Sequence, residues 1–564
     1  MFDIEEVSTA RLSPEGDPDP GVDYGEVFTR RWVVEFILDL IGYTPARDLG
    51  ACVVVEPSCG TGAFLGPIVD RLLESCVVHG RNPATLTGAV RACDVLDANA
   101  DRARKMVVER LRDGGLMSED AEAVAQAWVI ADDFLLRDHD LRSADYVVGN
   151  PPYVRLESVP RAVMAAYRDR CTAMRGRSDL YVGFVEVGLS LLKPGGALGF
   201  ICADRWMHNQ YGAQLRELVT ADYAVETVVT MHDVPAFEDE VSAYPAIVVI
   251  RNADQADVAV VEAKRSFGEA DAPALAAWAS SVSQAACGPT FEASRTTGWF
   301  KGGELWPMAS PTTLALVADL ERRYDPLQDA DKTTRVGIGV ATGCDEVFIT
   351  RDAALVEEDR LLPLLLASDT TSGAAVSSGA YLVNPWDEEG LVQLDAYPRL
   401  RDYLESHRAR LERRHVARKN PAQWYRTIDR VDPRLLRRQK LLLPDLKAAA
   451  HPVFDVGAFY PHHNLYYVVS DTWDLEVLGG LLLSDIANLF VGAYCVKMRG
   501  GCYRFQAQYL RKIRVPDPGS VAPADRRELA RVFRERDVDA ATAIANRVYG
   551  IDELPSDILH GCPK

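Results

Sequence analysis

The feature that most constrains the fold is a series of four short apolar runs early in the chain, each followed by a polar or glycine-containing turn. The runs cover residues 53–55, 90–94, 128–131 and 144–149. β-Branched residues favour strands, and the amphipathic stretch that follows the first turn, Leu65 to Leu73, favours a helix. Strands that alternate with helices form parallel sheets. The sequence therefore predicts an α/β fold with a Rossmann-like, doubly wound sheet.

The turn after the first run, Glu56-Pro57-Ser58-Cys59-Gly60-Thr61-Gly62, is typical of a loop that binds a nucleotide. Its two glycines allow the backbone to pass close beneath a ligand, although their spacing is not the GxGxxG of dinucleotide binders. The second run ends in Asp94, an acid suited to ribose hydroxyls. The third precedes Asp133 and Phe134, an acceptor for an exocyclic amine and a ring to cover a purine. Each acid alone is better explained as a strand end or helix cap, but their order along the chain predicts a cofactor site.

The tetrapeptide Asn150-Pro151-Pro152-Tyr153 follows the fourth run. An exocyclic amine of a base is a poor nucleophile, because its lone pair is delocalised into the ring. Asn150 Oδ1 and the Pro151 carbonyl are suitable acceptors for the two amine hydrogens, and Tyr153 offers a face on which a base can stack. A Pro-Pro turn at a strand end is the simpler structural alternative. With the upstream turns, the tetrapeptide indicates amino-group methylation.

These motifs resemble those of the gamma class of S-adenosylmethionine-dependent DNA adenine-N6 methyltransferases, most closely the TaqI-like enzymes of restriction-modification systems. The resemblance implies a catalytic domain over residues 1–255, with S-adenosyl-L-methionine as cofactor and a target adenine flipped out of duplex DNA. It extends to Tyr24-Gly25-Glu26-Val27-Phe28-Thr29 and to Asp179-Leu180-Tyr181-Val182-Gly183-Phe184. The implied cofactor-binding residues are Thr29, Glu56, Ser58, Cys59, Gly60, Gly62, Asp94, Asp133, Phe134, Asn150 and Phe184.

The resemblance assigns catalysis to Asn150-Pro151-Pro152-Tyr153 and to Phe237, which would sandwich the extruded base against the tyrosine. Tyr244 is a competing candidate for that second ring. Asn rather than Ser at the first position of the tetrapeptide favours adenine over cytosine within the family. The implied mechanism needs no metal, because the sulfonium is already an activated methyl donor.

The pattern changes after residue 255, which predicts a domain boundary in a chain too long for one core. Residues 256–330 include an Ala- and Ser-rich stretch from Ala272 to Ser294 and are expected to form a connector or helical insertion. Residues 331–564 resemble the TaqI-like specificity domain, which implies a mixed α/β target-recognition domain. Three glycines early in it suit a phosphate cradle or a bulged hairpin equally. They are Gly337, Gly339 and Gly343.

The charge distribution indicates where DNA would bind. The chain carries a formal net charge of −20, but residues 399–447 hold fifteen Lys and Arg against six Asp and Glu. Read as one helix, this segment places three arginines on one face, which suits a phosphate track; a solvated charged helix is the alternative. Two more arginines flank a Gly-Gly pair and suit a phosphate or base contact. The predicted DNA-binding residues are Arg410, Arg414, Arg418, Arg499 and Arg504.

Several other kinds of site are not expected. The eleven cysteines show no paired CxxC spacing and the chain begins with no signal-peptide pattern, so reduced thiols and a cytoplasmic location are predicted. His462-His463 has no ligand cluster of matching spacing, so no metal is predicted. The apolar stretch from Leu475 to Val496 contains Asp485 and Asn488, which favours buried helices over a membrane span.

The expected partner is double-stranded DNA, bound by a monomer, with a separate restriction endonuclease or defence-system subunit as a further partner. Three other functions stay open. Protein-glutamine methyltransferases also present Asn-Pro-Pro-Tyr, but the large C-terminal half and the motif around Thr29 argue against that substrate. RNA modification on the same core is the second, and a noncatalytic DNA-binding subunit of a defence assembly is the third. The intact cofactor motifs argue against the noncatalytic role.

Overall fold

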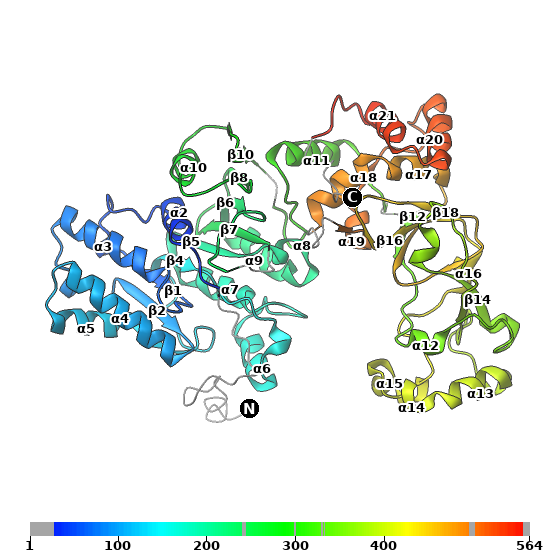
Figure 1. The fold of residues 1–564 in the computed structure, drawn as a ribbon, viewed down its shortest axis with the longest axis horizontal. Helices are drawn as coiled ribbons and strands as arrows, with labels where there is room; N and C mark the ends of the chain where they lie inside the picture. Colours follow the sequence, from blue (N-terminus) through cyan, green and yellow to red (C-terminus); the bar gives the residue numbers. More distant parts are fainter. Residues whose placement is uncertain are drawn as a thin grey trace. The chain divides into compact units, whose positions relative to one another are not determined.

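The four apolar runs form neighbouring strands of one sheet in the computed structural model (Figure 1). The strands are β1 (Val54–Glu56), β2 (Val90–Asp94), β3 (Val129–Ala131) and β4 (Ala144–Gly149). β1 lies between β2 and β4, and β3 lies outside β2, with every one of these pairs parallel. The parallel sheet expected from the sequence is therefore present.

The structure describes residues 27–239, 244–297, 300–328, 331, 333–495 and 502–555. The chain divides into two units, Met1–Pro311 and Thr312–Lys564. Each unit has sheets and a buried apolar core of its own.

Within the described residues, the sheet of the N-terminal unit has ten strands in the order β3-β2-β1-β4-β5-β7-β6-β8-β10-β9. The remaining strands are β5 (Leu192–Ala203), β6 (Ala224–Thr230), β7 (Pro245–Arg251), β8 (Val258–Ala263), β9 (Ala285–Cys287) and β10 (Phe291–Thr296). β5 continues the parallel part of the sheet beside β4, and β7 is antiparallel to both β5 and β6. Because β1 to β5 are all parallel, their carboxyl ends lie at the same edge of the sheet.

Helices cover both faces of this sheet (Figure 1). The helices of this unit are α2 (Arg31–Ile41), α3 (Leu65–His79), α4 (Asp97–Asp113), α5 (Ser118–Trp128), α6 (Arg161–Arg170), α7 (Tyr181–Leu191), α8 (Arg205–His208), α9 (Ala213–Asp222) and α10 (Ala272–Ala279), of which α6 lies away from the sheet (Figure 1). Successive strand residues point to opposite faces. On β5, Leu198 packs against Gly188 of α7, whereas Gly199 faces Ile41 of α2. The two helices therefore lie on opposite faces, which confirms the doubly wound arrangement.

The segment after residue 255 differs from the expected connector. β8 pairs with β6 in parallel, and β10 and β9 extend the same sheet. Phe267 packs against Trp32 and Phe36, with ring centroids 6.0 and 5.8 Å apart. The Ala- and Ser-rich stretch thus completes the N-terminal unit, because β9 pairs with β10, and β10 pairs with β8, which itself joins the sheet through β6.

The C-terminal unit is mixed α/β, as the sequence predicted. Its strands are β11 (Asp325–Pro326), β12 (Thr334–Ile338), β13 (Ile349–Thr350), β14 (Leu361–Leu365), β15 (Tyr381–Val383), β16 (Lys440–Pro444), β17 (Leu446–Lys447), β18 (Val453–Asp455), β19 (Tyr460–Pro461), β20 (Leu465–Ser470), β21 (Tyr503–Arg504) and β22 (Arg514–Val515). They form two four-stranded sheets, β12-β20-β16-β18 and β13-β15-β14-β19, and two two-stranded ladders.

The helices of this unit are short in its middle part and longer towards its end. They are α11 (Pro311–Arg323), α12 (Asp345–Phe348), α13 (Pro398–Ser406), α14 (Arg408–Leu411), α15 (His415–Lys419), α16 (Pro433–Leu436), α17 (Leu475–Leu483), α18 (Asp485–Tyr494), α19 (Ala507–Leu510), α20 (Pro523–Glu535) and α21 (Val538–Tyr549). No single helix among the described residues is long and apolar enough to cross a membrane. α17 and α18 reach that length only as a pair, bent by 64°.

Candidate active site

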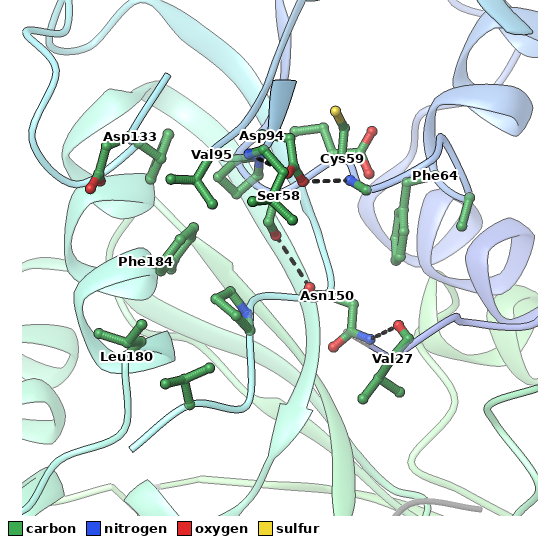
Figure 2. Close-up of a pocket in the computed structure, with 18 of the residues that line it drawn as sticks. Val27, Ser58, Cys59, Phe64, Asp94, Val95, Asp133, Asn150, Leu180 and Phe184 are labelled. Atoms are coloured by element: carbon green, nitrogen blue, oxygen red, sulfur yellow. Dashed lines mark hydrogen bonds between the residues drawn. The ribbon is translucent and has the colours of Figure 1, made fainter. Parts of the chain in front are cut away.

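A pocket lies at the carboxyl ends of the parallel strands, where the turns that the sequence singled out come together (Figure 2). Glu56 ends β1, Asp94 ends β2, Asp133 follows β3 and Asn150 follows β4. All four residues line the pocket. The topology therefore converts the order of motifs along the chain into one site.

Ten of the eleven predicted cofactor residues line this pocket. The exception is Gly62. It has a φ of +105°, and a Cβ at this position would clash with the Met106 side chain of α4. Gly60, with a φ of +51°, has open space where a Cβ would stand. Both glycines are needed for backbone conformation, but only Gly60 borders the pocket, whereas Gly62 allows the turn to pack against a helix.

The Asp94 carboxylate holds the glycine turn in place (Figure 2). Its Oδ2 accepts the Gly60 backbone N–H at 2.9 Å, and its Oδ1 accepts the Leu96 N–H at 3.0 Å and Asn99 Nδ2 at 3.3 Å. Asp94 therefore fixes the glycine turn at the edge of the pocket, whose lining it joins.

Glu56 presents an unsatisfied acceptor to the pocket. Its side chain is buried, and among the described residues its Oε2 has no hydrogen-bond partner. Burial, with the nearby charge of Asp94, raises the pKa of Glu56 well above its usual range. Buried polar atoms are normally paired, so an unpaired carboxylate oxygen at a pocket indicates a ligand donor. In this position, the Glu56 carboxylate is suited to accept hydrogen bonds from the positively charged amino group of a methionine moiety.

The opposite end of the pocket is aromatic and apolar. Phe134 stacks on Phe184 of α7, with ring centroids 5.4 Å apart and planes inclined by 20°. Asp133 Oδ2 accepts the Tyr167 hydroxyl at 2.7 Å, and Asp133 Oδ1 accepts the Leu135 N–H at 2.9 Å. Burial raises the pKa of Asp133, although these hydrogen bonds oppose the shift. This end of the pocket suits a planar purine and its exocyclic amine.

Asn150 is held by two acceptors on the chain segment that follows residue 26. Its Nδ2 donates to the Val27 carbonyl at 3.0 Å and to Thr29 Oγ1 at 3.2 Å, while Ser58 Oγ donates to the Asn150 carbonyl at 3.2 Å (Figure 2). The Asn150 Oδ1 atom is buried and has no hydrogen-bond partner among the described residues. The amide is thus fixed with a vacant acceptor at the pocket.

The ring of Tyr153 meets Phe237 edge to face, with centroids 6.2 Å apart and planes inclined by 82°. Phe237 is held by an isolated bridge to Thr29 and by Arg30, whose Nε donates to the Phe237 carbonyl at 2.8 Å. The competing ring, Tyr244, packs instead against His232, at a centroid distance of 5.1 Å. The two rings that were predicted to stack on a base, Tyr153 and Phe237, therefore contact each other directly in this structure.

Comparison with known proteins identifies the family. Residues 98–237 match the family described as Eco57I restriction-modification methylase. The chain is 44% identical over 560 residues to Type II methyltransferase M.PaeR7I of Pseudomonas aeruginosa, covering 98% of this chain and 96% of that protein. It is 41% identical over 553 residues to Type II methyltransferase M.XhoI of Xanthomonas vasicola, covering 95% and 98%. The chain belongs to the Type II methyltransferases.

The methyltransferase uses S-adenosylmethionine as its methyl donor. The residues present fit this cofactor, since the unpaired Glu56 oxygen and the aromatic wall of Phe134 and Phe184 stand at separate parts of one pocket. Its fold resembles the solved structure of the Type IIL restriction-modification enzyme MmeI in complex with DNA, with a TM-score of 0.55 and 11% identity. That match covers 94% of this chain and 74% of MmeI.

The predicted phosphate track in the methyltransferase's C-terminal unit is not a continuous helix, so the prediction of one arginine face is wrong. α14 ends at Leu411, Arg414 is extended with a φ of −68° and a ψ of 145°, and α15 begins at His415. Arg414 donates to the carbonyls of Thr342, Trp424 and Arg426 at 2.7–3.0 Å. The segment is interrupted because this guanidinium ties it to neighbouring loops.

The other predicted DNA contacts have different surroundings. Arg410 pairs with Glu346, and Arg504 pairs with Asp445. Arg418 is exposed. Arg499, the remaining predicted contact, lies outside the described residues. Most of these arginines therefore already have protein partners.

Close packing within the methyltransferase explains Gly337, which lies in β12, and Gly339, which follows it. A Cβ at Gly337 would clash with Tyr467 of β20, and a Cβ at Gly339 would clash with the His462 carbonyl. Both glycines are thus explained by close packing, and since β12 pairs with the distant strand β20, the contacts do not correspond to a bulged hairpin. Gly343, with a φ of +74°, borders a separate pocket together with Arg410 and Arg414.

Sequence reasoning missed Tyr167, which lies on α6 and donates to Asp133. It also missed the contacts of Val27 and Thr29 with Asn150. α6 carries no motif that marks Tyr167 as part of a pocket. Thr29 was singled out for the cofactor, but the reason for its position, which is to orient the Asn150 amide, depends on a contact 121 residues away in the chain.

Proposed function

We propose that the protein transfers a methyl group from S-adenosylmethionine to N6 of an adenine within a specific sequence of duplex DNA, as the modification enzyme of a restriction-modification system. The observation that carries this proposal is the vacant, buried Asn150 Oδ1 at the pocket. An acceptor fixed in this way stabilises an amine whose hydrogens become more acidic as its nitrogen is methylated. The names of the relatives, Type II methyltransferases, support DNA modification over protein or RNA substrates.

Different residues bind the cofactor and the target base. When bound, S-adenosylmethionine supplies a methyl group activated on a sulfonium. Glu56 holds the amino group of the methionine end, Asp94 accepts from the ribose, and Asp133 accepts from the adenine amine. These contacts would align the donor and exclude water from the reaction, and alignment alone can lower the barrier of such a transfer by about 7–11 kcal/mol.

The target base is held by the catalytic loop. Asn150 Oδ1 and the Pro151 carbonyl accept the two hydrogens of the target amine, so that the nitrogen lone pair turns from the ring towards the methyl group. Tyr153 and Phe237 hold the extruded base between their faces. An adenine within a stacked duplex cannot reach this loop, so flipping precedes transfer.

The test is mass analysis of nucleosides, with modified-base sequencing, on DNA incubated with the wild-type protein, Asn150→Ala and Asn82→Ala. Asn82 is exposed and is not among the residues that line the pocket, so it controls for the loss of an amide. We expect N6-methyladenine at one recurring sequence with wild type and Asn82→Ala, and a rate lower by about 10²–10³-fold with Asn150→Ala. DNA binding by Asn150→Ala should be retained.

Other outcomes would overturn parts of the proposal. N4-methylcytosine as the product would refute the choice of adenine. Methylation of RNA or protein with unmarked DNA would refute the substrate class. An unchanged rate for Asn150→Ala would remove this residue from the mechanism.

We further propose that the C-terminal unit selects the DNA sequence, while the N-terminal unit performs the transfer. The support is that the cofactor and catalytic motifs are all in the N-terminal unit, and that the basic segment 399–447 is in the other. A monomeric state, a cytoplasmic location and a separate restriction endonuclease stay predictions. Light scattering of the protein with and without a duplex tests the first of them.

A further inference from the structure

Three potential metal ligands meet in the C-terminal unit, away from the pocket described above. Asp345 is the first residue of α12, and His462 and His463 lie between β19 and β20. Their ligand atoms all lie within 4.8 Å of one another. Asp345 Oδ2 is 3.2 Å from His462 Nε2, which is 2.9 Å from His463 Nδ1. Two segments separated by 117 residues therefore converge on one point.

Hydrogen bonds alone satisfy this cluster poorly. His462 Nε2 faces both the Asp345 carboxylate and His463 Nδ1, but a ring nitrogen carries at most one proton. If His462 Nε2 is protonated and donates to Asp345, this nitrogen has no lone pair that could accept a proton from His463. If His463 Nδ1 instead donates to an unprotonated His462 Nε2, the His462 nitrogen cannot donate to Asp345. A cation between the three atoms would satisfy all of them at once.

The surroundings hold the ligands in position. The Thr342 hydroxyl donates to Asp345 Oδ1, which leaves Oδ2 directed at His462. The His463 backbone N–H donates to the Val340 carbonyl at 3.0 Å, and Val340 forms an isolated bridge with His462. Contacts of this kind, which orient ligands without touching the ion, are typical of metal sites.

The cluster is buried on one side and open on the other. The side chain of His462 is 6% exposed, whereas that of Asp345 is 48% exposed. Asp345 and His463 border a pocket that Cys344 and Glu346 also line.

We propose that Asp345, His462 and His463 bind a divalent transition-metal ion of the Zn²⁺ class, with a remaining coordination position open to the pocket. Imidazole nitrogens with a carboxylate oxygen are suitable zinc ligands, and a tetrahedral zinc site separates neighbouring ligand atoms by about 3.3 Å. The observed distances of 2.9 and 3.2 Å are close to this value. The ion would tie α12 to the β19–β20 connection, a role independent of methyl transfer.

The test uses the full-length protein, stripped with a chelator and then titrated with Zn²⁺ or, as a spectroscopic probe, Co²⁺. We expect one tightly bound Zn²⁺ per chain by elemental analysis, and visible Co²⁺ absorption that Zn²⁺ displaces. His463→Ala should weaken binding by at least about 100-fold, since loss of a supporting residue around a metal site already costs 10–100-fold. Asp345→Asn should weaken it in the same direction.

His415→Ala is the matched control, because His415 is exposed in the same unit and lies outside the cluster. It should keep the full Zn²⁺ content. A thermal unfolding curve for each variant separates loss of ligands from loss of fold, since a folded His463→Ala without Zn²⁺ supports the site. Absence of stoichiometric Zn²⁺ from the wild type, or equal Zn²⁺ retention by His463→Ala and His415→Ala, would refute it.

Discussion

The pocket of the N-terminal unit and two buried cations of the C-terminal unit differ in whether the protein itself satisfies their polar groups. At the pocket, Glu56 Oε2 and Asn150 Oδ1 are buried without partners among the described residues. In the C-terminal unit, the buried Lys440 and the half-buried Arg414 each donate to several acceptors. An unpaired buried acceptor beside a pocket indicates ligand binding, whereas a saturated cation indicates a structural role. Substitutions at the pocket should therefore cost function, and substitutions of these two cations should cost stability.

The largest effect is expected for Lys440→Met. Lys440 Nζ is 2.8 Å from Asp455 Oδ2, and both side chains are at most 1% exposed. Removal of the cation leaves a buried carboxylate without its counter-charge, which should lower the free energy of unfolding by about 3–5 kcal/mol in urea denaturation. Arg434→Met, which breaks the exposed pair with Asp432, should cause no measurable change. Equal stability of both variants would contradict a structural role for Lys440.

A smaller loss of stability is expected for Arg414→Ala. The substitution removes the donors to the carbonyls of Thr342, Trp424 and Arg426, and should lower the free energy of unfolding by about 2–3 kcal/mol. Arg413→Ala, at the exposed neighbouring position, is the control and should leave stability unchanged. If Arg414→Ala instead kept its stability and lost DNA affinity, Arg414 would be the phosphate contact that the sequence first suggested.

Glu56→Gln should change cofactor binding and not stability. Because the pKa of Glu56 is raised, the carboxylate becomes protonated as pH falls through that value, and the affinity for S-adenosylmethionine should then fall by up to about tenfold per pH unit. Glu56→Gln should bind weakly with no such slope. The raised pKa also means that the ionised group opposes folding above its unfolded-state pKa, so Glu56→Gln should be at least as stable as wild type at neutral pH. The measurement is calorimetric titration of S-adenosylmethionine at several pH values. If the affinity of Glu56→Gln still falls as the pH falls, Glu56 is not the source of the pH dependence.

The smallest effect is expected for Arg418→Ala, which tests whether any part of the predicted phosphate track survives. Arg418 is exposed, so its removal should leave unfolding unchanged. If Arg418 contacts a phosphate, the slope of log affinity against log salt concentration should fall by about 1. An unaltered slope in a fluorescence-anisotropy titration would remove Arg418 from the DNA-binding surface.

The cofactor site was predictable to a large extent because it is built from strand ends. Periodicity and β-branched residues located β1 to β4, and the order of the motifs placed Glu56, Asp94, Asp133 and Asn150 at one edge of the sheet. Parallel strands bring these turns together whatever the lengths of the helices between them. The lining role of Gly62 was not correctly anticipated, since its close approach is to Met106 of α4 rather than to the pocket.

The sequence by itself determined the α/β class, the strand–turn order and most of the pocket, because these follow from local patterns repeated along parallel strands. Only the tertiary structure decided that β8, β9 and β10 complete the first sheet, that Arg414 interrupts the basic segment, and that Asp345 joins the two adjacent histidines. Each of these depends on contacts between residues far apart in the chain. Such contacts produce no recognisable spacing between motifs in the sequence. The entropic cost of closing a long loop grows only slowly with the number of residues in it, so the two contacting segments need no fixed separation along the chain.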